Sequence, residues 1–241
     1  MMKGVIIAGG RGNRLRPLTN HLPKPMIPIL DKPVMEYCIQ HLKKHGITEI
    51  AVTVQYLSRK IMEYFGDGHE FGVKLTYFEE RKPLGTAGSI KNTEAFFDGT
   101  FVVMYGDVIS DFDLTKGIEY HQSKESLVTI FMTTVQNPLD YGIIKTDETG
   151  KVTRFLEKPS RLDVFTNQIS TGIFVMEPTI LHYIKKGVTV DFSLDIFPML
   201  LKNGCSLFGF KTTGYWSDVG NIAKYEKTVH DLIDGNIRIS G

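Results

Sequence analysis

The sequence predicts an α/β protein with a Rossmann-like, mostly parallel or mixed central sheet flanked by helices, together with a second, smaller lobe. Three observations predict it: short apolar runs alternate with helical patterns up to residue 113, that alternation lapses afterwards, and the chain has 241 residues. Strand–helix–strand repeats require right-handed crossovers, which produce a parallel sheet covered by helices. At roughly 150 residues per domain, the length allows one large domain or one domain with a small lobe.

The first part of the chain consists of strand and helix patterns in alternation. From Pro33 to His45, apolar residues recur at helical spacing, and Gly46 follows as a C-terminal cap. Short apolar runs without that spacing predict buried strands. We expect strands at Gly4–Ala8, Glu49–Val54, Val73–Phe78 and Thr100–Tyr105, and helices at Pro33–His45, Ser58–Phe65 and Thr86–Phe97.

After Asp113 the strands have fewer helices between them, which predicts a mixed sheet in the second lobe. We expect strands at Leu127–Thr133, Gly142–Lys145, Val152–Glu157 and Gly172–Met176, and helices at Pro178–Ile184, Leu194–Lys202 and Ile222–Ile233. The chain stops on a strand-like segment, residues 236–241, without a polar tail. We therefore expect it to be the N-terminal part of a longer protein.

Composition and charge exclude several classes of protein. Lysine and arginine total 28 and aspartate and glutamate 27, so the net charge of +1 provides no electrostatic footprint for nucleic acid or an anionic membrane. No apolar run approaches the ~20 residues that span a bilayer, and the apolar start is too short for a secretory signal. Cys38 and Cys205 stand alone and the seven histidines are scattered, so neither disulfides nor zinc are expected. We expect a soluble cytoplasmic protein, and the sequence leaves its oligomeric state open, a homo-oligomer included.

The segment after the first predicted strand, Ala8–Thr19, carries the strongest chemical signal. It lies where open α/β sheets bind ligands, beyond the carboxyl end of a strand. Gly9, Gly10 and Gly12 allow backbone N–H groups to approach phosphate oxygens, and the arginines of the segment add positive charge. No GK[ST] follows, and the third glycine of a dinucleotide fingerprint is missing, so neither a Walker loop nor a dinucleotide site is indicated. The alternative is a flexible turn with solvated arginines.

Gly9–Thr19 together with Lys24-Pro25-Met26 resembles the signature of the sugar-1-phosphate nucleotidyltransferases (NDP-sugar pyrophosphorylases), GGxGTRLxPLT followed by KPM. Asn13 stands where the family has Ser or Thr. The resemblance implies that Arg14 and Lys24 are catalytic and bind phosphates. The nucleotide contacts that it implies in this segment are Ala8, Gly9, Gly10, Gly12, Asn13 and Arg14.

Three later motifs complete the nucleotide and metal sites that the resemblance implies. Pro83–Gly88 is similar to the family's nucleobase loop, with Gly85 and Thr86 as contacts, and Thr86 also suits the N-cap of the helix that follows. Tyr105-Gly106-Asp107 resembles the family's GD motif, and Tyr215–Gly220 resembles its W-x-D-[VI]-G motif. The resemblance thereby implies that Asp107 and Asp218 are the two protein ligands of Mg²⁺, a cation that prefers oxygen ligands.

Two motifs in the second half are similar to the family's sugar-phosphate site. Tyr141-Gly142 and Glu157-Lys158-Pro159 match YG and EKP, in which the glutamate meets sugar hydroxyls and the lysine meets the sugar phosphate. Ser170-Thr171-Gly172 stands where the family often has N-[AST]-G, so Ser170 replaces an amide side chain. The implied sugar-phosphate contacts are Tyr141, Gly142, Glu157, Lys158, Ser170 and Thr171, and Lys158 is also implied to be catalytic.

The resemblance covers nearly the whole chain and implies a single catalytic domain, 1–241, of the nucleotide-diphospho-sugar transferase fold. Residues 1–113 are its expected nucleotide-binding half, and 114–241 are its expected sugar-binding half with a small sugar-binding lobe. The implied reaction transfers a nucleotidyl group from a nucleoside triphosphate to a sugar 1-phosphate and releases pyrophosphate.

Within the family, the stretches Pro33–Tyr37, Leu84–Gly88 and Gly214–Gly220 look most like mannose-1-phosphate guanylyltransferases. That likeness predicts GTP and mannose 1-phosphate as substrates and GDP-mannose as the product. The alternatives are a UTP- or dTTP-dependent glucose-1-phosphate nucleotidyltransferase, a non-catalytic regulatory homologue that binds nucleotide sugars, and a Rossmann oxidoreductase. The last needs an acidic residue at the end of the second strand, where Val54-Gln55 stands instead.

Overall fold

A computed structural model describes residues 2–237 of the chain. The chain folds into two compact units, each made of separate stretches of sequence. Unit 1 consists of Met1–Pro83, Met104–Phe112 and Gly214–Gly241, and unit 2 consists of Leu84–Val103 and Asp113–Thr213. This division differs from the expected one at residue 113, because residues 84–103 belong to unit 2 and the stretch from Gly214 onward belongs to unit 1.

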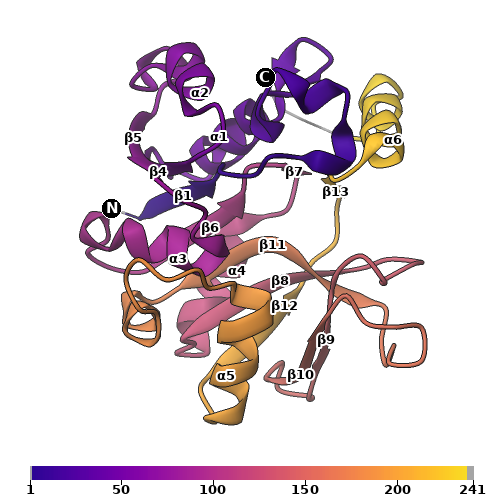
Figure 1. Cartoon of the computed structure of the whole chain (residues 1–241). Helices are drawn as coiled ribbons and strands as arrows, with labels where there is room; N and C mark the ends of the chain where they lie inside the picture. The colour runs from indigo at the N-terminus through magenta and orange to yellow at the C-terminus, as the bar shows by residue number, and fades with distance from the viewer. Residues whose placement is uncertain (1, 238–241) are drawn as a thin grey trace. The chain divides into compact units, whose positions relative to one another are not determined.

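Unit 1 is built on a parallel sheet with the strand order β1-β4-β5 (Figure 1). The crossover helices α1 and α2 lie on the same side of these strands, as right-handed connections require. The elements of unit 1 are β1 (Lys3–Ile7), η1 (Asn13–Leu15), η2 (Leu18–Asn20), η3 (Lys24–Met26), β2 (Pro28–Ile29), β3 (Lys32–Pro33), α1 (Val34–Lys44), β4 (Glu49–Val54), α2 (Ser58–Phe65), η4 (His69–Phe71), β5 (Lys74–Glu79), β7 (Val108–Ser110), β13 (Trp216–Asp218) and α6 (Ile222–Ile233).

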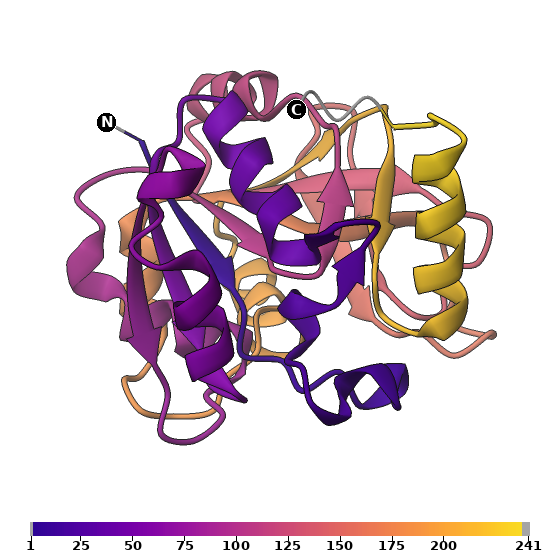
Figure 2. The same ribbon diagram turned by 90° about the horizontal axis from the view of Figure 1, so that it is seen from above.

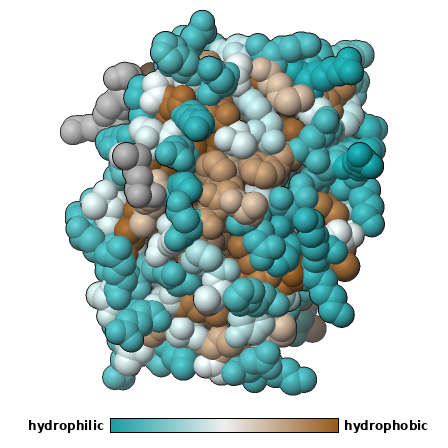
Figure 3. Space-filling model, turned by 90° about the vertical axis from the view of Figure 1, so that its left-hand side faces the viewer, coloured by the Kyte–Doolittle hydropathy of each residue, from teal (hydrophilic) through white to brown (hydrophobic). Residues whose placement is uncertain are grey.

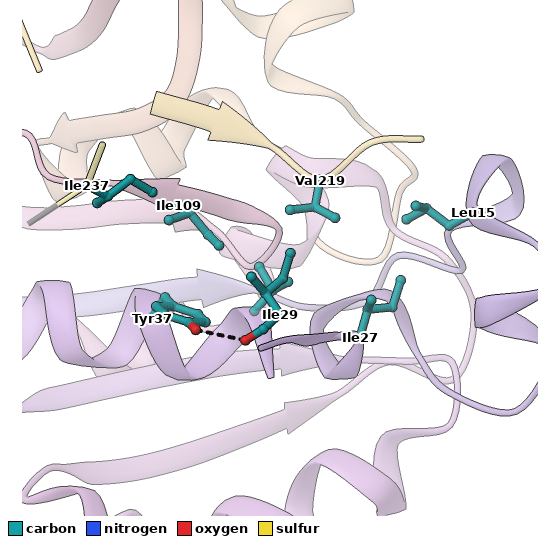
Figure 4. Close-up of a cluster of buried hydrophobic side chains, with 8 residues drawn as sticks. Leu15, Ile27, Ile29, Tyr37, Ile109, Val219 and Ile237 are labelled. Atoms are coloured by element: carbon teal, nitrogen blue, oxygen red, sulfur yellow. Dashed lines mark hydrogen bonds between the residues drawn. The ribbon is translucent and has the colours of Figure 1, made fainter. Parts of the chain in front are cut away.

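Within unit 1, an apolar cluster packs the stretch from Gly214 onward against the earlier parts of the chain (Figure 4). The cluster's buried members are Leu15, Ile27, Ile29, Val34, Tyr37, Ile109, Val219 and Ile237, and α6 packs Tyr225, Val229 and Leu232 against them. Inside the cluster, the hydroxyl of Tyr37 donates a hydrogen bond of 2.8 Å to the carbonyl of Ile29, which satisfies both buried polar groups. Figure 2 shows α6, in yellow, running beside β13. Burial of this face of α6 therefore fixes the neighbouring segment, which carries Asp218, to the core of unit 1.

Unit 2 contains a mixed sheet with the strand order β10-β9-β11-β8-β12, in which only the β8–β12 pair is parallel. Its elements are α3 (Gly85–Asn92), η5 (Glu94–Phe96), α4 (Leu114–Ser123), β8 (Val128–Thr134), β9 (Gly142–Thr146), β10 (Val152–Glu157), β11 (Gln168–Met176), η6 (Pro178–Tyr183), η7 (Phe192–Ile196), α5 (Phe197–Lys202) and β12 (Leu207–Lys211). β6 (Phe101–Tyr105) belongs to unit 2 up to Val103 and to unit 1 from Met104. The predicted mixed α/β architecture is confirmed.

Several predicted helices differ from the observed ones. The helix expected at Thr86–Phe97 ends at Asn92, because the buried hydroxyl and the N–H of Thr93 both bond to the carbonyl of Ile90 and close the last turn. The segment Pro178–Tyr183 is a 3₁₀ helix, and the helix expected at Leu194–Lys202 is a π-turn followed by α5. The sequence pattern does not predict α4, β2, β3, β7, β12 and β13, which are short or weakly periodic.

One face of the molecule has the mixed character of an ordinary globular surface. On the face in Figure 3, hydrophilic residues predominate and apolar residues gather in patches between them. Such patches are normal, because there is not enough polar surface to cover a protein. Among the described residues, no helix is long and apolar enough to cross a membrane.

Packing in unit 2 depends on the absence of a side chain at Gly117. This residue of α4 lies against the ring of Phe131, a fully buried residue of β8, and a methyl group at position 117 would overlap that ring. Gly117→Ala is therefore expected to lower the free energy of unfolding by about 1–3 kcal/mol, although alanine is the better helix former. Urea denaturation followed by circular dichroism measures this loss. Gly99→Ala is the control, because an added Cβ there has no neighbour within 4 Å; equal stability of both variants would contradict the packing described.

Candidate active site

The glycine-rich loop of unit 1 follows β1 and has a fixed backbone with exposed side chains. The N–H of Ala8 donates to the carbonyl of Thr53 at 2.9 Å, and the hydroxyl of Thr19 donates to the carbonyl of Gly12 at 2.9 Å. Leu15 is fully buried in the apolar cluster, whereas its neighbour Arg14 is exposed. An anchored, glycine-rich loop that presents an arginine to solvent is suited to binding an anion. Gly10 and Asn13 are likewise exposed.

Lys24 and Asp107 form a mostly buried ion pair beside this loop. Lys24 begins η3, and Asp107 lies between β6 and β7, two residues after the end of β6. The N–H of Gly106 donates to the carbonyl of Ile7 at 3.0 Å, which aligns the end of β6 with the end of β1. The two side chains that the sequence analysis placed in the phosphate and metal sites are thus in direct contact.

Asp218 is brought next to Asp107 by the pairing of β13 with β7. The antiparallel register places Asp218 opposite Val108, and the N–H of Val219 donates to the carbonyl of Asp107 at 2.8 Å. A Cβ added to Gly220 would lie 2.6 Å from Asp218 Oδ2 and 3.4 Å from Arg14 Nη2, so these two side chains converge on Gly220. Unit 1 therefore assembles Arg14, Lys24, Asp107 and Asp218 in one place.

Two carboxylates alone cannot fill the coordination sphere of a metal ion. Among residues 2–237, no group of three or more His, Cys, Asp or Glu side chains is placed to hold a metal ion. A pair of aspartates on neighbouring strand ends fits Mg²⁺ nonetheless, because this cation is usually held by one or two carboxylates, substrate phosphates and waters. The described residues thus fit a metal that is completed by its substrate.

Lys224 belongs to this constellation and was missed in the sequence. Its Nζ lies 2.9 Å from Oδ1 and 3.1 Å from Oδ2 of Asp218. The residue stands in the first turn of α6, six positions after the aspartate. Nothing in the local pattern marks it, because the W-x-D-[VI]-G resemblance ends at Gly220.

The predicted nucleobase loop in unit 2 is shaped by the segment around Val190. The N–H groups of Ala87 and Gly88 donate to the carbonyl of Val190 at 3.0 and 3.1 Å, so the first turn of α3 is capped by this backbone group. Gly85 has a φ of +71°, and a Cβ there would lie 2.5 Å from the Val190 oxygen. The glycine at position 85 is therefore required by packing, whatever it contacts in a ligand.

The prediction that Thr86 caps α3 is wrong. The N-cap residue is Leu84, and Thr86 lies within the first turn. Its hydroxyl donates to Asp191 Oδ2 at 2.8 Å and accepts from the N–H of Phe192 at 2.9 Å. Thr86 therefore ties α3 to the start of η7, a long-range partner that local sequence does not reveal. Its contact with a base stays a prediction.

Four predicted sugar-phosphate residues lie together in unit 2. β9 and β10 pair so that Gly142 is opposite Glu157, and the N–H of Lys158 donates to the carbonyl of Tyr141 at 3.0 Å. Burial raises the pKa of the Glu157 carboxyl, and the Lys158 ammonium, 3.9 Å away, opposes that effect. Lys158 itself is largely exposed. A mostly buried carboxylate beside an exposed lysine is suited to a ligand that has both hydroxyl and phosphate groups.

Ser170 and Thr171 on β11 differ in what they offer a ligand. Ser170 pairs with Met132 of β8 and is partly exposed. Thr171 is buried, and its hydroxyl donates to the carbonyl of Phe131 at 2.9 Å. The hydroxyl of Thr171 is therefore engaged within the sheet. The sugar contacts of both residues stay predictions.

Comparisons with known proteins show the family to which the chain belongs. Residues 3–235 match the family model described as nucleotidyl transferase, and the chain belongs to that family. It is 39% identical to a UTP–glucose-1-phosphate uridylyltransferase from Synechocystis sp., over 98% of this chain and 65% of the relative. It is 34% identical to a mannose-1-phosphate guanylyltransferase from Mycobacterium tuberculosis, over 96% of this chain and 64% of the relative. The chain thus spans slightly less than two thirds of the length of these curated relatives.

Solved structures share the fold along the whole chain. A Bacillus anthracis protein solved in complex with sucrose is 25% identical, with a TM-score of 0.88 over 100% of this chain and 98% of that one. HddC from Yersinia pseudotuberculosis is 28% identical, with a TM-score of 0.83 over 96% of this chain and 100% of that one.

The raised pKa of Glu157 makes stability depend on pH. The folded protein holds the Glu157 proton more tightly than the unfolded chain does, so this residue's contribution is complete at acidic pH and is lost as pH rises through the raised pKa. Glu157→Gln stays neutral and should raise the free energy of unfolding at pH 7–8 by up to about 2 kcal/mol. Urea unfolding at pH 4 and pH 8 measures this gain, which should vanish at pH 4. The exposed Glu148→Gln is the control, and a gain of the same size at both pH values would contradict the account.

Proposed function

We propose that the chain transfers a nucleotidyl group from a nucleoside triphosphate to a sugar 1-phosphate and releases pyrophosphate. The observation that carries the proposal is that unit 1 brings together four charged residues, Arg14, Lys24, Asp107 and Asp218, through the Lys24–Asp107 ion pair, the pairing of β13 with β7 and the approach of Arg14 and Asp218 to Gly220. Membership of the nucleotidyl transferase family supports it. A Rossmann oxidoreductase needs an acidic residue after β4, and Gln55 stands there.

The main requirement of this reaction is the neutralisation of charge. A sugar-phosphate oxygen attacks the α-phosphorus, a new P–O bond forms, and the bond to the bridging oxygen of pyrophosphate breaks. The attacking phosphate is ionised at neutral pH, so no general base is required. Two polyanions must instead be held together, which positioned cations achieve. We assign this task to Arg14 and Lys24 for the triphosphate and to Lys158 for the sugar phosphate.

The metal in this proposal is Mg²⁺, held by Asp107 and Asp218. When bound, it would supply positive charge to the phosphates without proton transfer. The two carboxylates, one between β6 and β7 and one at the end of β13, would orient it, and the backbone hydrogen bond from Val219 to Asp107 keeps these two residues together.

The remaining assignments follow the two halves of the substrate. Arg14 and five residues of the glycine-rich loop contact the nucleotide; these five are Ala8, Gly9, Gly10, Gly12 and Asn13. Gly85 and Thr86 contact the base. Tyr141, Gly142, Glu157, Ser170 and Thr171 surround the sugar, and the hydroxyl of Thr171, which already donates to Phe131, can only accept from a ligand. A cytoplasmic location stays a prediction.

The choice of base and sugar has two candidates. GTP with mannose 1-phosphate is supported by the mannose-1-phosphate guanylyltransferases among the relatives and by the structure of HddC complexed with GMP-PN. UTP with glucose 1-phosphate is supported by the uridylyltransferase at 39% identity. We keep GTP with mannose 1-phosphate as the proposed pair and UTP with glucose 1-phosphate as the second candidate.

One assay separates these candidates. Each nucleoside triphosphate is paired with mannose, glucose and N-acetylglucosamine 1-phosphate, and pyrophosphate release is measured. We expect kcat/KM for GTP and mannose 1-phosphate to exceed the others by at least about tenfold, or 1.4 kcal/mol. A tenfold preference for UTP and glucose 1-phosphate would reject the guanylyl candidate only, whereas no pyrophosphate from any pair would reject nucleotidyl transfer.

Two lysines test the charge argument. Lys24→Ala and Lys158→Ala should each lower kcat/KM by about 10²–10³, the usual cost of one electrostatic contact in a transition state. Lys60→Ala is the matched control, because Lys60 is an exposed lysine on α2 outside the site. Thermal melting monitors folding. Rates near those of the wild type in both site variants would contradict the assignment.

A further inference from the structure

Both carboxylates of the proposed metal pair are occupied by ammonium groups. Lys24 contacts Asp107, and Lys224 contacts both oxygens of Asp218 at 2.9 and 3.1 Å. The function proposed above accounts for Lys24 as a phosphate ligand. It gives no task to Lys224, whose contact with the carboxylate is equally direct.

The position of Lys224 is unfavourable for the helix that carries it. The residue lies in the first turn of α6, where its N–H bonds to the N-cap side chain of Asn221 at 2.9 Å. The positive end of the helix dipole lies there, and it disfavours a cation. The ion pair with Asp218 offsets this cost, so Lys224 is placed for the carboxylate rather than for the helix.

Lys227 on the same helix provides a contrast. It pairs with Asp231 one turn further on, and its side chain is 70% exposed. The side chains of Lys224 and Asp218 are only 20% and 19% exposed. Exposed pairs contribute little because water and salt screen them, whereas shielded pairs interact more strongly. The Lys224–Asp218 pair therefore has a substantial effect on any other cation that approaches Asp218.

We propose that Lys224 is a positioning residue that competes with the divalent cation for Asp218. Without the metal, its ammonium neutralises Asp218 and limits repulsion with Asp107 on the neighbouring strand end. The metal needs the same carboxylate oxygens, so Lys224 must release them for binding. Lys224 thereby weakens the affinity for free metal and makes occupancy depend on the phosphates that arrive with it. This inference rests on the metal pair of the proposed function.

Manganese titration without nucleotide tests the competition directly. The electron paramagnetic resonance signal of free Mn²⁺ reports binding to the whole chain, independently of turnover. We expect Lys224→Met to bind Mn²⁺ about tenfold more tightly than the wild type, which corresponds to 1.4 kcal/mol. Lys224→Arg, which keeps the charge, and Lys227→Met, which removes the exposed lysine, should bind as the wild type does. Thermal melting without metal should show a lower midpoint for Lys224→Met, and added Mn²⁺ should reverse that loss.

The outcomes separate this inference from the proposed function. Unchanged or weaker Mn²⁺ binding by Lys224→Met overturns the inference alone. If Lys224→Met does not fold, Lys224→Gln takes its place with the same expected direction. If Asp218→Asn binds Mn²⁺ as tightly as the wild type does, both the metal pair and this inference are overturned. Pyrophosphate release by the wild type tests nucleotidyl transfer separately.

Discussion

The pairing of β13 with β7 determines where the chemistry of unit 1 lies. It joins the C-terminal stretch to a strand from the middle of the chain, with Trp216 opposite Ser110 and Asp218 opposite Val108. The backbone bond from Val219 to Asp107 extends this pairing to the strand end, so the two aspartates become neighbours. The apolar cluster around Ile109 and Val219 stabilises the arrangement by burying one face of α6. The candidate metal pair is thus a consequence of ordinary strand pairing and core burial.

Charge balance is the second constraint on the molecule. In unit 1 each aspartate of the pair has its own lysine, and in unit 2 the buried Glu157 has Lys158 beside it. Such pairs reduce the cost of bringing carboxylates close together or out of water. They also mean that a polyanionic ligand or a metal has to exchange partners with groups already in place. The resting protein is therefore organised around the same charges that the proposed reaction uses.

The sequence predicted those features that are set by local patterns. The observed bounds of β4, α2, β10 and α6 equal the predicted ones, because hydrophobic periodicity and capping residues are local signals. Long-range contacts explain the failures: Thr86 bonds to Asp191 instead of capping α3, and residues 84–103 pack in unit 2 rather than with the first half. The glycine-rich loop after β1 indicated an anion site by its own residues, whereas the other site residues were found only through a family resemblance. Lys224 lies outside every motif, so only the folded chain reveals its contact with Asp218.

The central claim is that Asp107 and Asp218 act as one metal site that is completed by substrate phosphates. The most direct measurement is anomalous diffraction from crystals of the protein grown with Mn²⁺ and a non-hydrolysable nucleoside triphosphate. The account predicts a single strong manganese peak coordinated by carboxylate oxygens of both aspartates and by phosphate oxygens. A peak bound to other side chains would contradict it. A peak bound to the nucleotide alone, with Asp107 still paired to Lys24 and Asp218 to Lys224, would also contradict it.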